Sequence, residues 1–287
     1  MWMATAQLLF ALMGIGARIG GRDVPWPEVG AVRFLVGALT AYAVARARGE
    51  SLRIIRVRDA WMRSLFGTLS AAGTFYVYAS RGLAIGDAVT LLATSPIFVT
   101  LLSAPLLGER PRLGAVLALV TGFAGIALVA QPSFSTAGHV VAAGTGAALS
   151  SALAMIWLRR IGPTESSEAI AVHFSCIGFG IFLLVSLPVW RTPSPHDVLA
   201  LAFMGLSGGL AQIAMTRAYS LDHAARVSIL TFSSVVFMRA LAVPIFGEIP
   251  GPFQTAGSIL VITGGALLGL PGPRPAAVPR HPGSRSR

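Results

Sequence analysis

The chain carries two segments, about 139 residues apart, that match each other without gaps inside strongly apolar sequence. They are residues 87–109 (DAVTLLATSPIFVTLLSAPLLGE) and residues 226–248 (RVSILTFSSVVFMRALAVPIFGE). Both contain a serine, a phenylalanine and a proline at matched positions, and both end in Gly-Glu. Internal duplication within an apolar chain is typical of secondary transporters built from two repeats. The duplication therefore predicts a membrane bundle made of two related halves.

The overall composition also indicates a protein that crosses a membrane many times. Of its 287 residues, 54% are hydrophobic and only 11% are charged, whereas soluble domains carry roughly 25% charged residues. A helix needs about 20 mainly apolar residues to cross a bilayer. Ten spans are predicted, at residues 1–17, 29–45, 61–82, 88–107, 113–130, 138–158, 169–190, 198–216, 224–246 and 253–270. The loops are too short for a soluble domain, so the expected fold class is an all-α polytopic membrane protein.

The positive charge of the chain comes from arginine alone, because the sequence contains no lysine. With the N-terminus inside, the predicted cytoplasmic segments hold Arg46, Arg48, Arg53, Arg56, Arg58, Arg63, Arg110, Arg112, Arg159, Arg160, Arg217, Arg226, Arg274, Arg280, Arg285 and Arg287. The predicted outer loops hold only Arg18, Arg22, Arg81 and Arg191. This bias predicts an inner-membrane protein with both termini in the cytoplasm. It disfavours a nucleic-acid-binding surface, because the arginines flank apolar spans.

Five predicted spans fall in each half of the chain, at residues 1–130 and 138–270. An odd number of spans forces the second half to insert upside down, so we expect an inverted repeat of two five-helix units. The tail, residues 271–287, is rich in proline and arginine and is expected to be disordered and cytoplasmic. Cys176 is the only cysteine, which excludes an intrachain disulfide and cysteine-based metal sites. The sequence leaves a homodimer open.

The Gly-Glu pairs suggest how the fourth and ninth spans end. Gly108 and Gly247 can each terminate a helix. Pro111 and Pro250 then suit the first turn of the next helix, whose positive end would lie close to Glu109 and its repeat mate. We interpret both glutamates as structural, with direct substrate or proton handling as the alternative.

These features resemble the drug/metabolite transporter superfamily and, within it, the EamA family. The resemblance rests on Gly108-Glu109-Arg110, on the Gly247-Glu248 pair and on the two fivefold repeats, and it covers nearly the whole chain apart from the tail. Other similar stretches are LFALMG (9–14), GDA (86–88), SPIFVTLLS (95–103), RRIGPTES (159–166) and TRAY (216–219). The resemblance implies a central cavity between the repeats, alternately open to each side, with no bound cofactor. It does not name a cargo.

Polar side chains inside the predicted spans are the candidates for substrate binding, since ionisable groups are costly there. The seven candidates are Arg33, Tyr76, Ser95, His173, Gln212, Ser234 and Arg239. Arg33 and His173 are repeat mates, and Arg239 lies about seven residues, or ~10 Å, from the outer end of its span. The structural alternatives are a headgroup contact for Arg33, a hydrogen bond for His173, and bonds to kink-freed carbonyls for Arg239.

The charge pattern inside the spans bears on the cargo. No Asp or Glu falls in the middle of a predicted span, whereas a guanidinium there suits a carboxylate. We therefore expect a secondary, ATP-independent carrier of a small metabolite, carboxylate-bearing or amino-acid-like, that works by alternating access. An exporter of cationic or amphipathic drugs is the alternative. A membrane-embedded enzyme is disfavoured, because the histidines are too scattered to form a catalytic or metal site.

Overall fold

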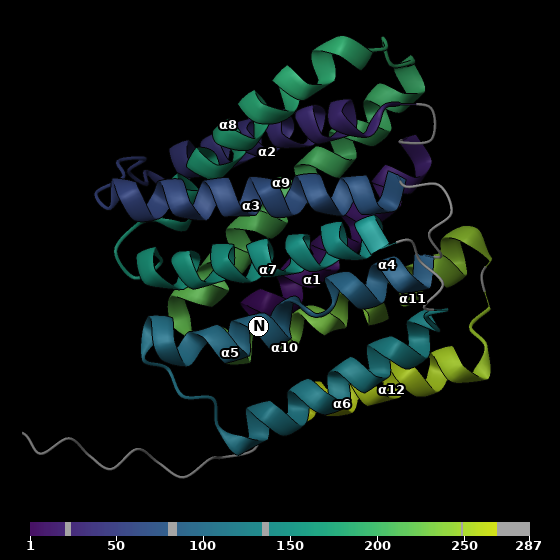
Figure 1. The fold of residues 1–287 in the computed structure, drawn as a ribbon. Helices are drawn as coiled ribbons and strands as arrows, with labels where there is room; N and C mark the ends of the chain where they lie inside the picture. The colour runs from purple at the N-terminus through teal and green to yellow at the C-terminus, as the bar shows by residue number, and fades with distance from the viewer. Residues whose placement is uncertain (21–23, 80–84, 134–137, 248, 269–287) are drawn as a thin grey trace, which may run out of the picture.

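The computed structural model describes residues 1–20, 24–79, 85–133, 138–247 and 249–268, and its regular structure within these ranges is helical (Figure 1). The α-helices are α1 (Trp2–Gly20), α2 (Trp26–Arg48), α3 (Val57–Ala79), α4 (Ile85–Leu92), α5 (Ser95–Leu107), α6 (Leu113–Ala130), α7 (Gly138–Ile161), α8 (Ser167–Ser186), α9 (Pro195–Leu221), α10 (Ala224–Ile229), α11 (Ser233–Phe246) and α12 (Pro252–Leu267). Two 3-10 turns are η1 (Leu187–Val189) and η2 (Leu230–Phe232). The predicted tail lies outside the described residues.

The helices run side by side, so their termini gather at two opposite ends of the bundle (Figure 1). One end, at the left in Figure 1, holds the links that follow α2, α5, α7 and α9. We call it the arginine-rich end, because it carries Arg46, Arg48, Arg53, Arg56, Arg58, Arg110, Arg112, Arg159, Arg160, Arg217 and Arg226. The opposite end holds the start of α2 and the link after α8, and we call it the Trp190 end.

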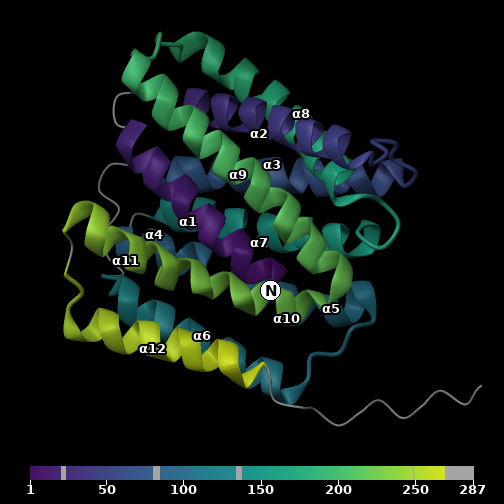
Figure 2. The same ribbon diagram turned by 180° about the vertical axis from the view of Figure 1, so that it is seen from behind.

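Helices from the two halves of the chain pack against each other in matched pairs. The first helix of each half packs on the third helix of the other half, giving the pairs α1 with α9 and α7 with α3. The mates α2 and α8 pack together along one edge of the bundle, and α6 and α12 pack along the opposite edge (Figure 2). An inverted duplication predicts this exchange, since a pseudo-two-fold axis carries each contact onto its mate. The halves are therefore interleaved.

The fourth and ninth predicted spans each form a membrane-spanning stretch, and each of these stretches contains a break between two helices. Residues 93–94 separate α4 from α5, and η2 separates α10 from α11. A hydroxyl donates to the carbonyl three residues back at both breaks, Thr94 Oγ1 to Leu91 at 2.6 Å and Ser233 Oγ to Leu230 at 2.7 Å. Such local bonds compete with the helical ladder. The repeat places these two bonds at matched positions, so the break belongs to both halves.

The surface and the helix lengths identify a multi-pass membrane protein. Within the described residues, seven helical stretches are long and apolar enough to cross a membrane: Trp26–Arg48, Asp87–Leu107, Leu113–Ala130, Gly138–Ile161, Ser167–Val189, Pro195–Leu221 and Ala224–Phe246. The apolar part of α1 is shorter (Trp2–Gly16), α3 begins with Arg58 and Asp59, and α12 has 16 residues. Large apolar side chains such as Leu184 and Leu199 are 69% and 74% exposed, a surface that suits lipid and not water.

The predicted helix ends after the fourth and ninth spans are partly correct. Gly108 and Gly247 follow α5 and α11 in the left-handed region, with φ of 70° and 67°, a conformation that costs glycine little. Pro111 and Pro250 do not fall in the first turn of α6 and α12, as the sequence suggested. Each lies one residue before the N-cap, whose extended backbone precedes the helix.

The backbones of α6 and α12 approach each other at small residues placed symmetrically. An ideal Cβ atom on Gly257 would lie 2.5 Å from the carbonyl oxygen of Gly125, and one on Gly264 would lie 3.0 Å from that of Ala118. The repeat offset of 139 carries Ala118 onto Gly257 and Gly125 onto Gly264. Small residues permit such close approach between helices in lipid. The α6–α12 edge is therefore held by direct backbone contact.

Candidate functional site

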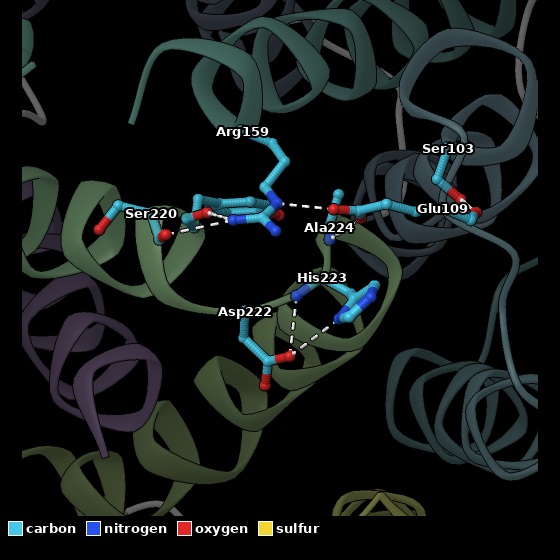
Figure 3. Close-up of polar contacts among 8 residues, drawn as sticks. Ser103, Glu109, Arg159, Ser220, Asp222, His223 and Ala224 are labelled. Atoms are coloured by element: carbon cyan, nitrogen blue, oxygen red, sulfur yellow. Dashed lines mark hydrogen bonds and ion pairs between the residues drawn. The ribbon is translucent and has the colours of Figure 1, made fainter. Parts of the chain in front are cut away.

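The polar contacts at the arginine-rich end converge on Glu109, two residues past the end of α5 (Figure 3). Its Oε1 accepts a hydrogen bond from Arg159 Nε at 2.7 Å, and its Oε2 accepts one from the backbone N–H of Ala224 at 2.8 Å. Arg159 Nη1 also donates to the carbonyl oxygens of Tyr219 and Ser220, both at 3.1 Å. One ion pair therefore ties α5, from the first half of the chain, to α7, α9 and α10 of the second half.

Glu109 contacts a helix start, as the structural interpretation expected, but the helix is α10 and not α6. It accepts from the first residue of α10, where the partial positive charge of a helix start favours a carboxylate. The side chains of Glu109 and Arg159 are only 13% and 20% exposed, so solvent screens this pair less than a surface ion pair. The repeat mate, Glu248, lies outside the described residues.

Further contacts join the two halves at the same end. Arg48 Nη1 pairs with Glu168 Oε1 at 3.0 Å, linking the end of α2 to the start of α8. Glu165 Oε1 accepts from the backbone N–H groups of Ile55 and Arg56, at 3.0 and 2.8 Å. A polar network at the arginine-rich end therefore links both halves of the chain.

At the Trp190 end, the start of α2 meets the link after α8. Glu28, which is fully buried, accepts from the backbone N–H of Arg191 at 3.0 Å. A hollow beside this contact is lined by apolar residues of α2 and of the α8 end, including Trp26, Pro188 and Trp190. It faces outward from the bundle edge and lies away from the contacts around Glu109.

Arg63 lies inside the bundle, in the second turn of α3, and is not on the exposed surface of the arginine-rich end. The residue is 1% exposed, and its guanidinium carbon lies 4.2 Å from the centre of the Phe174 ring. An ideal Cβ atom on Gly67 would lie 2.2 Å from Arg63 Nη1, which shows that the side chain extends along α3 toward the bundle interior. Among the described residues, nothing accepts a hydrogen bond from its Nε or Nη1.

Arg33, one of the predicted site residues, lies between α1, α2 and α9. Its Nε donates to Met13 Sδ at 3.3 Å, and its guanidinium carbon lies 4.7 Å from the Phe34 ring centre. An ideal Cβ atom on Gly208 of α9 would lie 3.6 Å from the same nitrogen. The Phe34 ring packs edge-on to the Phe174 ring that lies under Arg63, with centroids 5.2 Å apart. Two guanidinium groups, one from α2 and one from α3, therefore face the same interior region.

His173, the repeat mate of Arg33, does not lie beside Arg33. Its Nδ1 lies 2.8 Å from Ser64 Oγ, and its ring packs edge-on to Trp61 with centroids 5.4 Å apart. Both partners belong to the first two turns of α3, near the arginine-rich end. These contacts match the structural alternative given for His173, a hydrogen bond that fixes the ring.

The remaining candidates are spread over several helices. Ser95 and Ser234 stand at the start of α5 and α11, next to the two helix breaks, and residues flanking both breaks pack against one hydrophobic cluster. Gln212 of α9 is 3% exposed, and its Nε2 lacks an acceptor among the described residues. Tyr76 on α3 is 41% exposed. Arg239 on α11 is partly exposed and forms no ion pair with a described acid.

Several buried polar groups were not singled out by the sequence. Besides Arg63, they include the Tyr219 hydroxyl on α9 and the Thr68 hydroxyl on α3, both at most 1% exposed and without a partner among the described residues. Two signals pointed toward them: Arg63 lies two residues inside a predicted span, and Tyr219 ends the TRAY stretch. The buried atoms without a described partner therefore include donors and also an acceptor, Glu28 Oε1. Within the described residues no cluster of metal-ligating side chains occurs.

Comparison with known proteins places these features in a family context. The profile of the EamA-like transporter family matches the chain twice, at residues 1–131 and at residues 139–270. A solved crystal structure shares the fold, with a TM-score of 0.81 over 94% of this chain and 97% of that chain at 22% identity.

Sequence relatives cover nearly the same extent. The pseudopaline exporter CntI of Pseudomonas aeruginosa is 27% identical over 263 residues, which span 90% of each chain. The riboflavin transporter of Vibrio cholerae is 23% identical over 273 residues, 93% of this chain and 91% of its own. Solute carrier family 35 member G1 of Homo sapiens is 25% identical over 217 residues, 70% of this chain and 59% of its own. The first two relatives are named for different molecules, and the name of the third specifies none.

Proposed function

The chain belongs to the EamA-like transporter family, and on that premise we propose that it is a secondary carrier that moves a small metabolite by alternating access. The family and the named relatives indicate a membrane transporter of a small molecule and not an enzyme. The observation that carries the mechanism is the interleaving of the two halves, in which α1 packs on α9 and α3 packs on α7. These two helix pairs are related by the pseudo-two-fold axis, so the bundle can open at one end and then at the other. Such switching is the basis of alternating access in inverted repeats.

The proposed topology has ten spans, with the arginine-rich end in the cytoplasm. It counts α4 with α5, and α10 with α11, as one broken span each, and it includes α1, α3 and α12. Among the described links at the opposite end, Arg191 is the arginine present, whereas the arginine-rich end carries many. The positive-inside rule therefore favours this orientation in the inner membrane. An even number of spans then places both termini in the cytoplasm. The contacts around Glu109 and Glu168 support a proposed state that is closed at this end.

The proposed cargo is a small molecule with a carboxylate, as the sequence suggested. Arg33 and Arg239 lie within spans and form no ion pair with a described acid, and a guanidinium in low dielectric binds a carboxylate strongly. Two of the relatives are named for pseudopaline and for riboflavin, so similarity to them does not identify one cargo. The competing proposal, a cationic or amphipathic drug, is an outcome of the test below.

The function is tested by thermal unfolding of the detergent-purified protein against a metabolite panel, followed by counterflow in proteoliposomes. A ligand of the folded state raises the melting temperature by mass action. Proteoliposomes that contain the carrier and are loaded with unlabelled ligand should then accumulate labelled ligand without ATP or an imposed ion gradient. Flux that neither saturates nor responds to ligand on the opposite side contradicts the carrier mechanism.

The same screen gives a prediction for Arg239→Gln. If Arg239 contacts the cargo, the variant should bind an anionic metabolite about tenfold or more weakly, because a hydrogen-bonded charge is lost. The melting temperature without ligand should stay near that of the parent, since Arg239 has no described ion partner to lose. Stabilisation by apolar cations that is unchanged in Arg239→Gln would instead favour the drug-exporter function and make Arg239 structural.

A further inference from the structure

The outward-facing hollow at the Trp190 end lies where α2 begins and where α8 and η1 end. Its volume is about 750 Å³, and cavities of roughly 300–1,000 Å³ hold small organic ligands. Its lining consists of Pro25, Trp26, Pro27, Val185, Pro188, Val189, Trp190 and Arg191. These residues are prolines, valines and tryptophans with one arginine among them, so an apolar wall meets a single positive charge.

The hollow lies at the level where a bilayer changes from acyl chains to headgroups. Trp26 is the first residue of one spanning stretch, and the stretch Ser167–Val189 ends directly before Trp190. Tryptophan collects at this level in membrane proteins. In the proposed orientation this level belongs to the outer leaflet. A molecule in the hollow can therefore touch apolar side chains with one part and water with the other.

The corresponding place at the arginine-rich end is filled by direct contacts between protein groups. There the start of α8 meets the end of α2 and the link that follows it. Ser166 Oγ donates to the carbonyl oxygen of Ser51 at 2.9 Å, and Arg48 Nη1 pairs with Glu168 Oε1 at 3.0 Å. The two halves of the chain thus meet at this end without a hollow among these four residues.

The repeat carries these four residues onto the Trp190 end, where their mates make different contacts. The offset in this part of the chain is 140, as for Arg33 and His173. The mates of Ser51, Ser166, Arg48 and Glu168 are, in that order, Arg191, Trp26, Pro188 and Glu28. Proline offers no donor to Glu28, which accepts only from the backbone N–H of Arg191 among the described residues. The other three mates line the hollow.

Arg191 offers an uncompensated charge to a molecule in the hollow. Its side chain is exposed and forms no ion pair or hydrogen bond with a described residue. Its backbone is held at 3.0 Å by Glu28, which is fully buried. Asp197, the next described acid along the chain, is bound to Ser194 in the cap of α9. A guanidinium in this setting suits a phosphate, which it can bind through two parallel hydrogen bonds.

We propose that the hollow binds a phospholipid of the surrounding membrane, with its phosphate on Arg191 and part of an acyl chain against the apolar wall. The lipid takes the place that direct protein contacts fill at the arginine-rich end. It bridges α2 of the first half and α8 of the second half, so its binding stabilises this edge of the bundle. The inference goes beyond the transport function and requires only that the chain lies in a membrane.

The test measures lipid binding to delipidated full-length protein in dodecyl maltoside, through the melting temperature and through native mass spectrometry. The probes are phosphatidylglycerol and phosphatidylethanolamine, which carry a phosphate, and diacylglycerol with the same acyl chains, which lacks one. Arg191→Gln removes the charge, and Trp190→Ala removes part of the apolar wall. Arg53→Gln is the matched control, because Arg53 is exposed in the link after α2 at the opposite end.

The expected result is saturable stabilisation of the parent and of Arg53→Gln by at least one of the two phospholipids, and little by diacylglycerol. Arg191→Gln should raise the apparent Kd of that phospholipid about fivefold. Trp190→Ala should raise it about threefold, because an aromatic contact with the lipid is lost. Without added lipid, both variants should melt near the parent temperature, since Arg191 is exposed and Trp190 is 47% exposed.

Three results would overturn the inference. The first is an equal phospholipid Kd in the parent and in Arg191→Gln, and the second is equal stabilisation by phospholipid and diacylglycerol. The third is a loss of affinity in Arg53→Gln as large as in Arg191→Gln, which would place the lipid at the arginine-rich end. Counterflow is measured separately on the parent, so failure of the lipid site leaves the carrier function standing. Absence of counterflow contradicts the carrier function without affecting the lipid site.

Discussion

Glu109→Gln is expected to slow transport at least about tenfold and to loosen the arginine-rich end of the bundle. The glutamine keeps the shape but loses the charge that holds Arg159 at 2.7 Å and caps Ala224 at 2.8 Å. Removing one partner of a largely shielded, charged hydrogen bond costs about 2 kcal/mol. That cost corresponds to roughly a thirtyfold shift in the equilibrium between closed and open forms of this end. The variant carrier should then spend most of its transport cycle with the arginine-rich end open.

Two measurements check this prediction, namely turnover in counterflow and amide exchange of the helix ends that the pair joins. Peptides covering residues 216–230 should exchange hydrogen faster in Glu109→Gln, since the Ala224 N–H and the α9 end lose their anchor. Glu50→Gln is the control, because Glu50 is exposed in the link after α2. Unchanged exchange together with unchanged turnover would show that the ion pair does not hold the closed end.

A double-mutant cycle with Arg159→Gln separates the pair from its other contacts. Arg159 also binds the carbonyls of Tyr219 and Ser220, so its loss alone should be the more harmful. If the pair acts as a unit, the double variant should be less destabilised than the sum of the single variants, by about 1 kcal/mol or more. Strict additivity would assign the two residues to separate roles.

Gly257→Ala should destabilise the protein strongly, because the added methyl group would meet the backbone of the neighbouring helix. Its Cβ atom would lie 2.5 Å from the carbonyl oxygen of Gly125 and 2.8 Å from a methyl group of Val129, so α6 and α12 would have to separate. Overpacking of this kind costs roughly 1–3 kcal/mol or more. The gain in helix propensity from Gly to Ala, about 1 kcal/mol, offsets only part of that cost. The melting temperature should fall by several degrees.

Gly265→Ala provides a control on the same helix. No atom lies within 4 Å of an ideal Cβ at Gly265, so this change should be neutral or slightly stabilising through propensity alone. Fluorescence-detected melting of both variants and the parent, in one detergent, compares them directly. A Gly257→Ala protein that melts with the parent would mean that the two helices can shift apart at little cost, and that their close contact is not what holds the edge.

The sequence reached the fold class and the family through features that are local or periodic. Ten apolar segments, the duplication at offset 139 and the Gly-Glu helix ends are all visible without coordinates, because lipid demands long apolar helices and because glycine suits a left-handed cap. The family match at residues 1–131 and 139–270 agrees with the resemblance. The left-handed φ angles at Gly108 and Gly247 confirm the two helix ends.

The breaks in the fourth and ninth spans were invisible to the same reasoning. A hydropathy average depends only on the side chains in a window. It contains no information about which backbone carbonyl accepts a hydrogen bond from each backbone N–H group. The bonds from Thr94 to Leu91 and from Ser233 to Leu230 replace part of the helical ladder without changing composition. A matched pair of hydroxyls at the repeat offset was the available signal, and serine and threonine are too common in spans for it to stand out.

The composition and order of residues by themselves determined that this chain spans a membrane as two related halves, since burial in lipid is decided segment by segment. Only the tertiary structure decided which polar side chains meet. The Glu109–Arg159 pair joins residues 50 apart in sequence, and the buried Arg63 lies beside Gly67 of α3 and over the Phe174 ring of α8. A charged side chain in a span can point toward the lipid headgroups or into the bundle. Which of these occurs depends on the rotation of its helix and on the size of the neighbouring side chains, and helix packing sets the rotation and the neighbours.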